Sequence, residues 1–487
     1  MKLNKLLLNI PIISTKHLSE ETDIAAIVFD SRKVVEHSIF VAIKGTLSDG
    51  HQYIEKAIQD GAVAVICEEM PAHLVEHVSY IAVENSHLVL GRLASNFYEH
   101  PSQSLQVVGI TGTNGKTSTS TFLFQLFTDL GYKVGLLSTI NVKIGDRILP
   151  STHTTPDAVT IQKYMRDMVE AGCEYCFMEV SSHAIDQYRI EGIQFKGAVF
   201  TNITHDHLDY HGTFQNYIYT KKRLFDSLPN DAFALINLDD KNGQVILQNT
   251  KARRKTFALY QIADYVVRIL ENYIDGMMLK IEEKDVFVKI LGEFNAYNLL
   301  SVYAVARELG VKKEEIILGL SKLHSVEGRF QTILSTHQKI QGVIDYAHTP
   351  DAVEKLLSEI NKIKKTGNII TIIGCGGNRD AEKRPIMARI ACDLSHRVLL
   401  TSDNPRDEDP VQIIKEMKEG LSLDQIRKTL TIIDRKEAIK TACMLAENGD
   451  YIVIAGKGHE KYQEIKGEKF PFDDNKILSD LFIELEL

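Results

Sequence analysis

The chain has 487 residues, of which 44% are hydrophobic and 25% are charged, values typical of a soluble globular protein. Its length suggests about three domains, each large enough to bury a core without disulfides or structural zinc. The 56 Lys and Arg against 65 Asp and Glu give a net charge of −9. A general nucleic-acid-binding protein would have an excess of basic residues, so we do not expect one here.

The chain begins with MKLNKLLLNIPII, which resembles a secretory signal only loosely. Asn9 interrupts its apolar part, and no small-residue cleavage site follows. No apolar run along the sequence reaches the roughly 18 residues of a membrane-spanning helix. The six cysteines follow no framework pattern, which fits a reducing compartment. We therefore expect a cytoplasmic protein, monomeric and without membrane insertion.

The first hundred residues alternate between short strand and helix patterns. We expect a helix over residues 88–101 that Pro101 ends, because proline cannot continue a helix. A boundary between residues 100 and 106 would close a small N-terminal α/β domain, residues 1–104.

The second segment opens with an apolar run, residues 105–110, that suits a buried parallel strand. A glycine turn and a helix ending near Gly131 follow, and strand and helix patterns then alternate to residue 204. Residues 252–290 are richer in β-forming residues, and a helix pair at 296–324 comes last. This order predicts a mostly parallel sheet flanked by helices, in a central domain of residues 105–331.

The third segment, residues 332–487, repeats the strand–helix alternation from Thr332 onward. It predicts a doubly wound sheet of Rossmann type, in which the loops after the strands carry ligand sites. Those loops are polar and rich in glycine or proline: CGGNRD, SDNPRDEDP and GKGHE. The fold class expected for the whole chain is therefore α/β.

A glycine loop between a strand and a helix is the clearest chemical signal: Gly112-Thr113-Asn114-Gly115-Lys116-Thr117. In that context backbone N–H groups and the helix N-terminus favour phosphate, Lys116 suits the outer phosphates, and the Thr117 hydroxyl suits Mg²⁺. Ile110 stands where the standard motif has its first glycine, so the loop is a shortened variant. A plain glycine turn is the alternative.

Two further strand ends carry groups that could bind metal. Glu179 ends a strand that follows the glycine loop, where a carboxylate can reach the magnesium of a nucleotide. The segment TNITHDHLDYHG contains His205, His207 and His211, which makes zinc conceivable, although their spacing matches no zinc signature. We favour His207 as a magnesium ligand and keep zinc as the alternative.

The only close cysteine pair in the sequence, Cys173 and Cys176, lies on an expected buried strand without a second pair to complete a metal site. We expect both side chains in the core.

Ten segments occur in one order that resembles a known family: TGTNGKTS, MEVSSHA, TNITHDHLDYHG, YTKKRLF, GEFNAYNLL, EGRF, VIDYAHTPDA, GCGGNRDAEKRP, TSDNPRDEDP and AGKGHEKYQ. They resemble the Mur ligases, the ATP-dependent amide-forming enzymes of peptidoglycan precursor synthesis, and most of all the members that add the third amino acid. The resemblance implies an N-terminal UDP-sugar domain, a central ATPase and a C-terminal amino-acid domain. It also implies ATP, Mg²⁺, UDP-N-acetylmuramoyl-L-alanyl-D-glutamate and meso-diaminopimelate as cofactors and substrates.

The resemblance also implies binding residues, position by position. Those implied for ATP are Gly112, Thr113, Asn114, Gly115, Lys116, Thr117, Ser118, Asn295, Arg329, Asp345 and His348. Those implied for the muramoyl-dipeptide nucleotide are Ser31, Thr154, Thr155, Ser181, Gln187 and Arg189. Those implied for diaminopimelate are Arg379, Lys383, Asp403, Asn404, Arg406, Gly456 and Glu460.

The catalytic residues that the resemblance implies are Lys116, Glu179, His207 and a carbamylated lysine. Thr117 and Glu179 resemble ligands of one magnesium ion, and Glu179 and His207 resemble ligands of a second. The family places an N6-carboxylysine beside them, because carbamylation turns an ammonium into an anionic oxygen ligand. YTKKRLF offers Lys221 and Lys222, and its spacing favours Lys221.

The sequence Asp403-Asn404-Pro405-Arg406 is the form that the resemblance associates with meso-diaminopimelate rather than L-lysine. Diaminopimelate has a second carboxylate, which Arg406 can bind with two parallel hydrogen bonds. Lysine would leave a buried Arg406 unpaired, at a cost of about 2–5 kcal/mol. L-lysine as the added amino acid, an ordinary ion pair of Arg406 with Asp407 or Asp409, and a non-catalytic nucleotide-binding protein are the alternatives.

Overall fold

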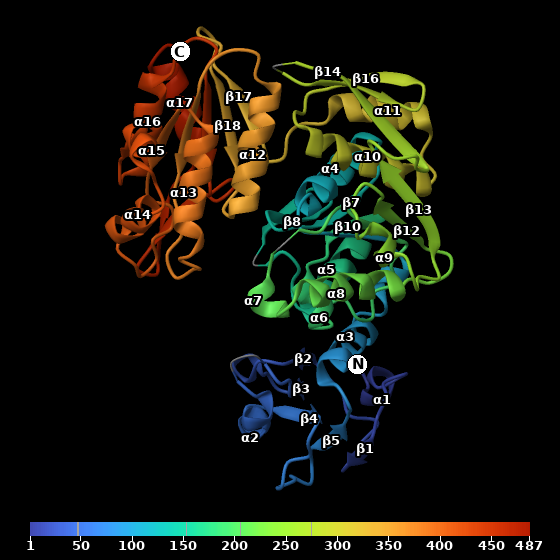
Figure 1. Cartoon of the computed structure of the whole chain (residues 1–487). Helices are drawn as coiled ribbons and strands as arrows, with labels where there is room; N and C mark the ends of the chain where they lie inside the picture. The colour runs from blue at the N-terminus through green and yellow to red at the C-terminus, as the bar shows by residue number, and fades with distance from the viewer. Residues whose placement is uncertain (46–47, 152, 205, 274) are drawn as a thin grey trace. The chain divides into compact units, whose positions relative to one another are not determined.

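A computed structural model describes residues 1–487 except 46, 47, 152, 205 and 274 and the side chain of residue 209. The chain divides into two compact units, and Figure 1 colours their elements by residue number. The first unit comprises Met1–Val266 and Tyr297–Gly319, and the second comprises Val267–Ala296 and Leu320–Leu487. Helices α10 (Glu293–Glu308) and α11 (Lys313–Lys322) therefore each have residues in both units.

The first unit begins with a small sheet in the order β1-β5-β4-β3-β2. Its strands are β1 (Ser14–Lys16), β2 (Ala26–Val28), β3 (Ser38–Val41), β4 (Ala62–Cys67) and β5 (Ser79–Ala82). Its helices are α1 (Leu3–Leu6), α2 (Ile54–Gln59) and α3 (Ser86–Phe97). Neighbouring strands run parallel except β1, which pairs antiparallel with β5.

The larger sheet of the first unit has the order β13-β12-β11-β6-β10-β7-β8-β9. Its strands are β6 (Gln106–Thr111), β7 (Val134–Leu137), β8 (Asn141–Ile144), β9 (Arg147–Pro150), β10 (Tyr175–Glu179), β11 (Gly197–Phe200), β12 (Phe233–Asn237) and β13 (Arg253–Ala258). Its helices are α4 (Lys116–Asp129), α5 (Ala158–Glu170), α6 (Ser182–Asp186), α7 (Leu208–His211), α8 (Phe214–Asp226) and α9 (Gly243–Ile246). All pairings from β13 to β7 are parallel, so the loops that leave β6, β10 and β11 meet at one edge.

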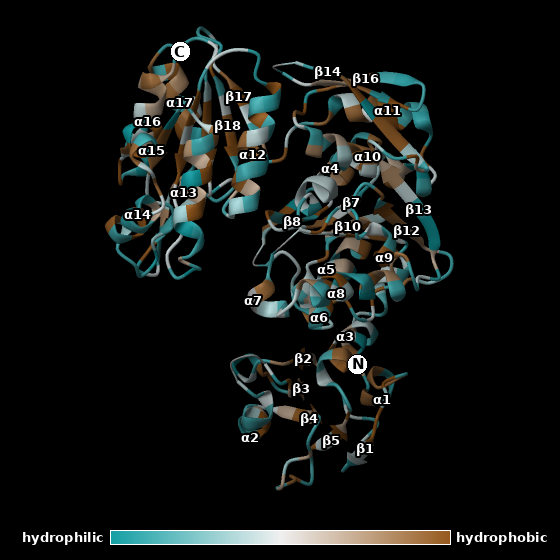
Figure 2. Ribbon diagram, viewed as in Figure 1, coloured by the Kyte–Doolittle hydropathy of each residue, from teal (hydrophilic) through white to brown (hydrophobic). Residues whose placement is uncertain are grey.

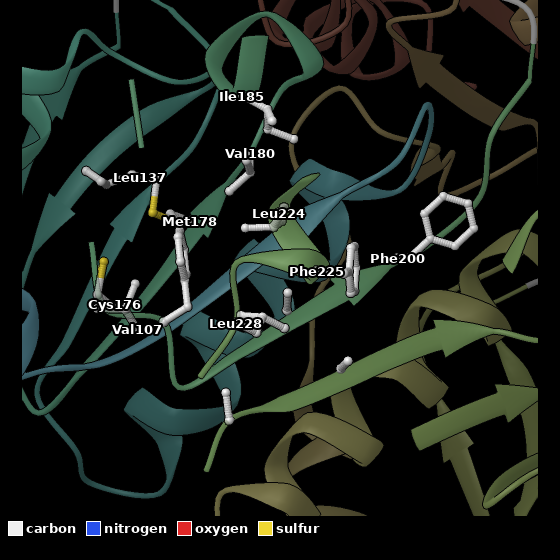
Figure 3. Close-up of a cluster of buried hydrophobic side chains, with 14 of the residues drawn as sticks. Val107, Leu137, Cys176, Met178, Val180, Ile185, Phe200, Leu224, Phe225 and Leu228 are labelled. Atoms are coloured by element: carbon white, nitrogen blue, oxygen red, sulfur yellow. The ribbon is translucent and has the colours of Figure 1, made fainter. Parts of the chain in front are cut away.

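The core beside this sheet joins the strands to α8. Figure 3 shows Val107 of β6, Met178 of β10 and Phe200 of β11 in one buried cluster with Leu224, Phe225 and Leu228. Cys173 and Cys176 belong to the same buried cluster and are not disulfide-bonded, which confirms the expectation that they are core residues. Thr213 accepts a hydrogen bond from the Asn216 amide and so caps the start of α8.

The second unit starts with an antiparallel meander of β14 (Tyr265–Asn272), β15 (Met277–Ile281) and β16 (Lys284–Val288). The first two residues of β14 lie in the first unit, where they pair with β13. These strands confirm the β-rich character expected for residues 252–290.

The main sheet of the second unit has the order β17-β18-β22-β19-β20-β21. Its strands are β17 (Gln331–Leu334), β18 (Gln341–Asp345), β19 (Ile369–Ile373), β20 (Arg397–Leu400), β21 (Thr429–Thr431) and β22 (Tyr451–Ala455), followed by a hairpin of β23 (Tyr462–Ile465) and β24 (Glu468–Pro471). Its helices are α12 (Pro350–Ile363), α13 (Lys383–Leu394), α14 (Pro410–Lys418), α15 (Leu423–Arg427), α16 (Arg435–Leu445) and α17 (Asp474–Glu484).

Helices cover this sheet from two sides (Figure 1). Helix α12 packs against α13, and α13 against α14, while α16 packs against α17. In Figure 2, α12 carries both brown and teal residues, as expected for a helix with one face on a core. Only β17, at the edge, runs antiparallel. The α/β fold class with mostly parallel sheets, and the doubly wound layout of residues 332–487, are thereby confirmed.

The helix expected over residues 88–101 is shorter than predicted. Helix α3 ends at Phe97, and Glu99 and His100 adopt left-handed backbone angles, φ 58° and 52°. Pro101 then starts a 3₁₀ turn instead of ending the helix. Nothing in the apolar pattern marks these two left-handed residues, because neither is a glycine. Among the described residues, no helix has the length and apolar character needed to cross a bilayer.

The packing of α8 on the central sheet predicts a large effect for Phe225→Ala. The Phe225 side chain is fully buried, so its removal leaves a cavity and should destabilise the first unit by about 3–5 kcal/mol. Tyr219→Ala is the matched control, because Tyr219 lies on the same helix and is 48% exposed. Denaturant unfolding should show the loss for Phe225 alone; equal loss in both variants would contradict this account of the core.

Candidate active site

The glycine loop lies between β6 and α4, as predicted, and packs tightly against the residues that follow β11. A Cβ atom on Gly112 would lie 2.0 Å from Thr201 Oγ1, and one on Gly115 would lie 2.5 Å from Asn298 Oδ1. Both glycines also have positive φ angles, 149° and 86°. No other residue type fits at these two positions without displacing its neighbours.

Backbone and side-chain hydrogen bonds hold the loop in place. The Thr113 amide donates to Asn202 O at 2.8 Å, and the Asn114 amide donates to Asn202 Oδ1 at 3.1 Å. The Lys116 ammonium lies over the loop, 2.9 Å from Gly112 O and 2.8 Å from Thr113 O. Ser118 is buried in the first turn of α4. A backbone cradle with a lysine at a helix N-terminus is suited to bind phosphate.

Glu179 is fully buried at the end of β10, directly beside the loop. Its carboxylate accepts a hydrogen bond from Thr117 Oγ1 at 3.0 Å and from the Thr139 amide at 2.7 Å. Thr139 Oγ1, 3.2 Å away, is a further donor. The sequence-predicted pair of Thr117 and Glu179 is therefore in contact, and it offers the hard oxygen ligands that Mg²⁺ prefers.

The two candidate lysines of α8 point to different partners. Lys221 is 1% exposed, and its ammonium lies 3.0 Å from Gly112 O and 4.7 Å from the centre of the Tyr217 ring. Burial, together with the charge of Lys116, holds the pKa of Lys221 well below its usual value. Lys222 instead pairs with Asp226 at 2.6 Å. Of the two, only Lys221 contacts the glycine loop in the described part of the chain.

The histidines of TNITHDHLDYHG divide among different environments. His207 is at the start of α7, with its side chain 46% exposed and 3.5 Å from Asp206. His211 is buried, and its Nε2 lies 3.0 Å from Ser182 Oγ. His205 is outside the described residues. Among the residues that the structure describes, no group of three His, Cys, Asp or Glu side chains is placed to hold a metal ion.

A second cluster lies at the end of β10 and contains four of the residues implied for the muramoyl-dipeptide. Thr155 Oγ1 donates to Glu179 O at 2.9 Å and accepts from the Ser181 amide at 3.1 Å. Arg189 donates to Thr155 O at 2.9 Å and, through Nε and Nη2, to Gln187 Oε1 at 3.0 and 2.6 Å.

The hydrogen-bond chain continues away from this cluster through residues that sequence reasoning missed. Gln187 Nε2 donates to Tyr210 OH at 3.1 Å, and Tyr210 donates to Asp186 at 2.9 Å. Because Gln187 is held from both ends, the Arg189 guanidinium has a defined orientation. Thr154 joins the region through Thr139, whose Oγ1 is 3.2 Å from Thr154 Oγ1. Burial lowers the pKa of Arg189.

Ser31 lies in the small N-terminal sheet domain, buried at the start of a 3₁₀ turn that Asp30 caps. The remaining residues implied for ATP are in the second unit. Asn295 donates to Leu291 O at 2.8 Å, and the Arg329 guanidinium stacks 4.7 Å from the centre of the Tyr346 ring. Asp345 accepts from the Phe330 amide at 2.7 Å, and His348 Nδ1 lies 2.8 Å from Tyr346 O. Asn298 lies in the same segment as Asn295, GEFNAYNLL, and sequence reasoning did not select it. Its Oδ1 lies close to Gly115 of the glycine loop.

The residues implied for diaminopimelate gather at the carboxyl ends of β19, β20 and β22. Asn404 is 3% exposed, and its Nδ2 donates to Glu460 Oε2 at 2.7 Å. Asp403 accepts from the Asn404 amide at 2.6 Å. Gly456 has a φ of 114°, and a Cβ atom there would lie 2.5 Å from Asp403 Oδ2. This glycine is therefore required for the strand to pass so close to the carboxylate.

Arg406 has neither of the partners that the sequence offered for an ordinary ion pair. Asp407 instead accepts from Asn378, and Asp409 caps α14. Arg406 Nη1 donates to Gly377 O at 2.7 Å, and its Nε lies 3.3 Å from Glu464.

The two remaining residues implied for diaminopimelate are on the loop between β19 and α13 and on α13 itself. Arg379 is exposed on that loop, and Lys383 donates to His348 O at 3.0 Å. Arg384 is buried beside them and pairs with Glu408 at 2.9 Å.

A buried lysine, Lys457, is a residue of this pocket that sequence reasoning missed. It is fully buried, and its ammonium donates to Asn404 Oδ1 at 2.8 Å and lies 3.3 Å from Glu460. Lys457 belongs to the loop GKGHE, which the sequence analysis named as a candidate ligand-binding loop. The sequence of that loop does not reveal that its lysine is buried. Glu464 had no signal in the sequence at all.

The close approach at Gly112 predicts that Gly112→Ala weakens nucleotide binding at least about tenfold, since the new methyl group displaces Thr201 and distorts the backbone N–H groups of the loop. Gly131→Ala is the control, because Gly131 also has a positive φ, 90°, but meets nothing within 4 Å. Calorimetric titration with ADP and ATP tests both. Equal affinity of the two variants would show that the close packing of the loop is unimportant.

Comparisons with known proteins agree with this arrangement. Three family models match: the Mur ligase family catalytic domain over residues 23–98, the Mur ligase middle domain over 110–306, and the Mur ligase glutamate ligase domain over 328–458. A protein of Cytophaga hutchinsonii named UDP-N-acetylmuramoyl-L-alanyl-D-glutamate–2,6-diaminopimelate ligase is 51% identical over 482 residues, 99% of each chain. One of the same name from Bacteroides fragilis is 49% identical over 484 residues, again 99% of each.

Solved structures agree as well. A structure with that same ligase name has a TM-score of 0.73 and 32% identity, and the match covers 100% of this chain and 99% of the other. A MurF ligase from Thermotoga maritima in complex with ADP, at 20% identity and a TM-score of 0.62, shares the fold; the match covers 95% of this chain and 98% of the other. With its sheets, its glycine loop and relatives about half identical along its full length, this chain belongs to the Mur ligase family.

Proposed function

We propose that this chain is an ATP-dependent ligase that joins meso-2,6-diaminopimelate to UDP-N-acetylmuramoyl-L-alanyl-D-glutamate in peptidoglycan synthesis, releasing ADP and phosphate. The observation that carries the proposal is the cluster of Asp403, Asn404, Arg406 and Glu460 at the carboxyl ends of the strands of the second unit. It combines carboxylates with a guanidinium, as an amino-acid head requires. The names of the relatives at about 50% identity support the same reaction.

The proposal assigns one role to each part of the chain. Residues 1–104 bind the UDP-sugar, residues 105–331 bind ATP, and residues 332–487 bind the amino acid. Residues of the matched middle and glutamate ligase domains support the second and third assignments. Ser31 is the proposed contact to the UDP group in the first.

The residues around the glycine loop fit a nucleotide with magnesium. Gly112 and Gly115 let the loop pack closely against Thr201 and Asn298, and the Lys116 ammonium donates to Gly112 O and Thr113 O of the same loop. Thr117 and Glu179 would supply oxygen ligands for one magnesium ion. For a second ion the proposed ligands are Glu179, a ring nitrogen of His207 and the carbamate oxygen of a modified Lys221. Magnesium, when bound, neutralises charge on the phosphates.

The reaction needs two anions, a carboxylate and a phosphate, to approach one another. A carboxylate oxygen of the D-glutamate attacks the γ-phosphorus of ATP, and the bond to ADP breaks to leave an acyl phosphate. The role of Lys116 is to place a positive charge beside the phosphates, and that of Arg189 is to place one beside the peptide. Gln187 and Thr155 hold the Arg189 guanidinium in its orientation through three hydrogen bonds.

The amine of the incoming amino acid then attacks the acyl carbon. Phosphate leaves with the electrons of the C–O bond, and the nitrogen loses a proton as the amide forms. For this step the amino acid must be held by its far end. We assign that task to Arg406 for the carboxylate and to Asp403 or Glu460 for the ammonium, which gives diaminopimelate an advantage over lysine.

A carbamate on Lys221 fits the surroundings of that side chain. The lowered pKa favours the neutral amine, which adds to CO₂ and releases one proton to form an N6-carboxylysine. The modified side chain has an anionic oxygen beside the glycine loop, in place of a cation that would face Lys116.

The free cysteines are consistent with a location of the protein in a reducing cytoplasm. We also propose that the protein is a monomer.

Phosphate release from ATP in the presence of Mg²⁺ and the muramoyl-dipeptide nucleotide tests the function directly. Turnover with meso-diaminopimelate and very little with L-lysine is the expected result, because lysine has no second carboxylate for Arg406. Preference for lysine would keep the ligase and reject the specificity argument. Absence of turnover with either amino acid would reject the proposed reaction.

The adjacent lysines of α8 allow a matched test of the carbamate. Lys221→Ala should abolish ligation, and a small carboxylic acid added to the assay should restore part of it. Lys222→Ala should retain most activity, because that side chain pairs with Asp226 of the same helix and not with the glycine loop. With ¹³C-labelled bicarbonate, a carbamate NMR signal should be present in wild type and Lys222→Ala and missing in Lys221→Ala. The opposite pattern would move the modification to Lys222.

A further inference from the structure

The hairpin of β23 and β24 lies along the loop 402–406 and contacts most of its residues. Gln463 Nε2 donates to Asp403 O at 2.7 Å and to Ser402 Oγ at 3.3 Å. The Glu464 amide donates to Asn404 Oδ1 at 2.9 Å. The hairpin thus reaches the part of the pocket that is proposed to recognise the amino acid, and Glu464 is the first residue after the family-like segment AGKGHEKYQ.

Two backbone hydrogen bonds tie Arg406 itself to the hairpin. The Arg406 amide donates to Glu464 O at 3.1 Å, and the Lys466 amide donates to Arg406 O at 2.8 Å. Arg406 has a positive φ of 50°, which costs energy for a residue that is not glycine. The flanking hydrogen bonds offset that cost and keep the side chain directed toward Gly377.

The Glu464 side chain determines which edge of the Arg406 guanidinium is used. Its carboxylate lies 3.3 Å from Arg406 Nε, while Gly377 O accepts from Nη1 at 2.7 Å. The remaining N–H groups of the guanidinium are on Nη1 and Nη2, at the end of the side chain. That end has the two parallel donors that a carboxylate binds.

Asn404 links the same hairpin to the acidic side of the pocket. Its Oδ1 accepts from both Lys457 and the Glu464 amide, so its Nδ2 must be the group that donates to Glu460. Residues 404, 406, 457, 460 and 464 therefore form one connected hydrogen-bond network within the second unit. The backbone amide of Glu464 makes the link to Asn404, while its carboxylate is the group that contacts Arg406.

We propose that Glu464 is a positioning residue that holds Arg406 with its terminal N–H groups toward the distal carboxylate of the amino acid, and so contributes to the choice of diaminopimelate over lysine. This inference rests on the proposed function. Glu464 acts through Arg406 and does not itself bind the substrate.

Steady-state kinetics of Glu464→Ala, with meso-diaminopimelate varied, tests the inference. The KM for diaminopimelate should rise at least about tenfold, the effect of one hydrogen bond to a charged group. The KM values for ATP and for the muramoyl-dipeptide nucleotide should stay unchanged, which also shows that the variant is folded. Glu464→Gln keeps a side-chain acceptor and should show a smaller rise. Activity with L-lysine relative to diaminopimelate should increase in Glu464→Ala.

A double-mutant cycle with Arg406→Ala separates positioning from direct binding. If Glu464 acts through Arg406, Arg406→Ala/Glu464→Ala should have the same KM for diaminopimelate as Arg406→Ala alone. Effects that add, together with equal damage from Glu464→Gln and Glu464→Ala, would overturn the proposal and make Glu464 a direct ligand of the ammonium. An unchanged KM in Glu464→Ala would also overturn it.

The control is Glu468→Ala, which removes an exposed carboxylate from the other strand of the same hairpin. It should leave every KM unchanged; a rise equal to that of Glu464→Ala would assign the effect to the hairpin as a whole and overturn the role of the Glu464 side chain. A wild-type enzyme that does not use diaminopimelate would reject the proposed function instead, so the two failures are distinguishable.

Discussion

Parallel pairing of β6 with β10 and β11 is the constraint on which the rest of the nucleotide site depends. The register sets Glu179 beside Ile110 and Phe200 beside Thr111, so all three strands end at the same edge. A glycine loop leaving the middle strand must then pass within contact of Thr201 and Asn202. The same parallel geometry brings the loop glycines, the buried Glu179 and the N-terminus of α4 to one edge of the sheet.

The second unit repeats this logic with different side chains. Strands β19, β20 and β22 are neighbours and parallel, and their loops carry Gly377, Asp403 and Gly456 to one place. There the polar groups satisfy one another: Lys457 is fully buried yet bonded to Asn404, and Arg406 is bonded to Gly377 and Glu464. A preorganised set of this kind can recognise a zwitterion without first rearranging its own charges.

Each of the two sites contains a buried lysine, Lys221 beside the glycine loop and Lys457 in the second unit. The groups around such a lysine determine whether its charged form is favoured. Lys221 is buried under the glycine loop, where its ammonium lies near the Thr111 hydroxyl and Gly112 O. Burial and the charge of Lys116 lower its pKa and so disfavour the ammonium form. Lys222, one position further, pairs with Asp226 instead. Adjacent lysines in one helix thus differ in chemistry because consecutive side chains point about 100° apart around the helix.

The sequence by itself determined the α/β class, the glycine loop with its strand and helix, and the segments that resemble the Mur ligases, because these depend on local patterns of residues. It also pointed to Glu179, Lys221 and the loops that carry Arg406 and Glu460. Only the tertiary structure decided that Asn298 meets the glycine loop, that Tyr210 and Asp186 support Gln187, and that Glu464 and Lys457 hold Arg406 and Asn404. Those contacts join residues far apart in the chain, and the choice of partner follows from strand order and register, which no local pattern encodes.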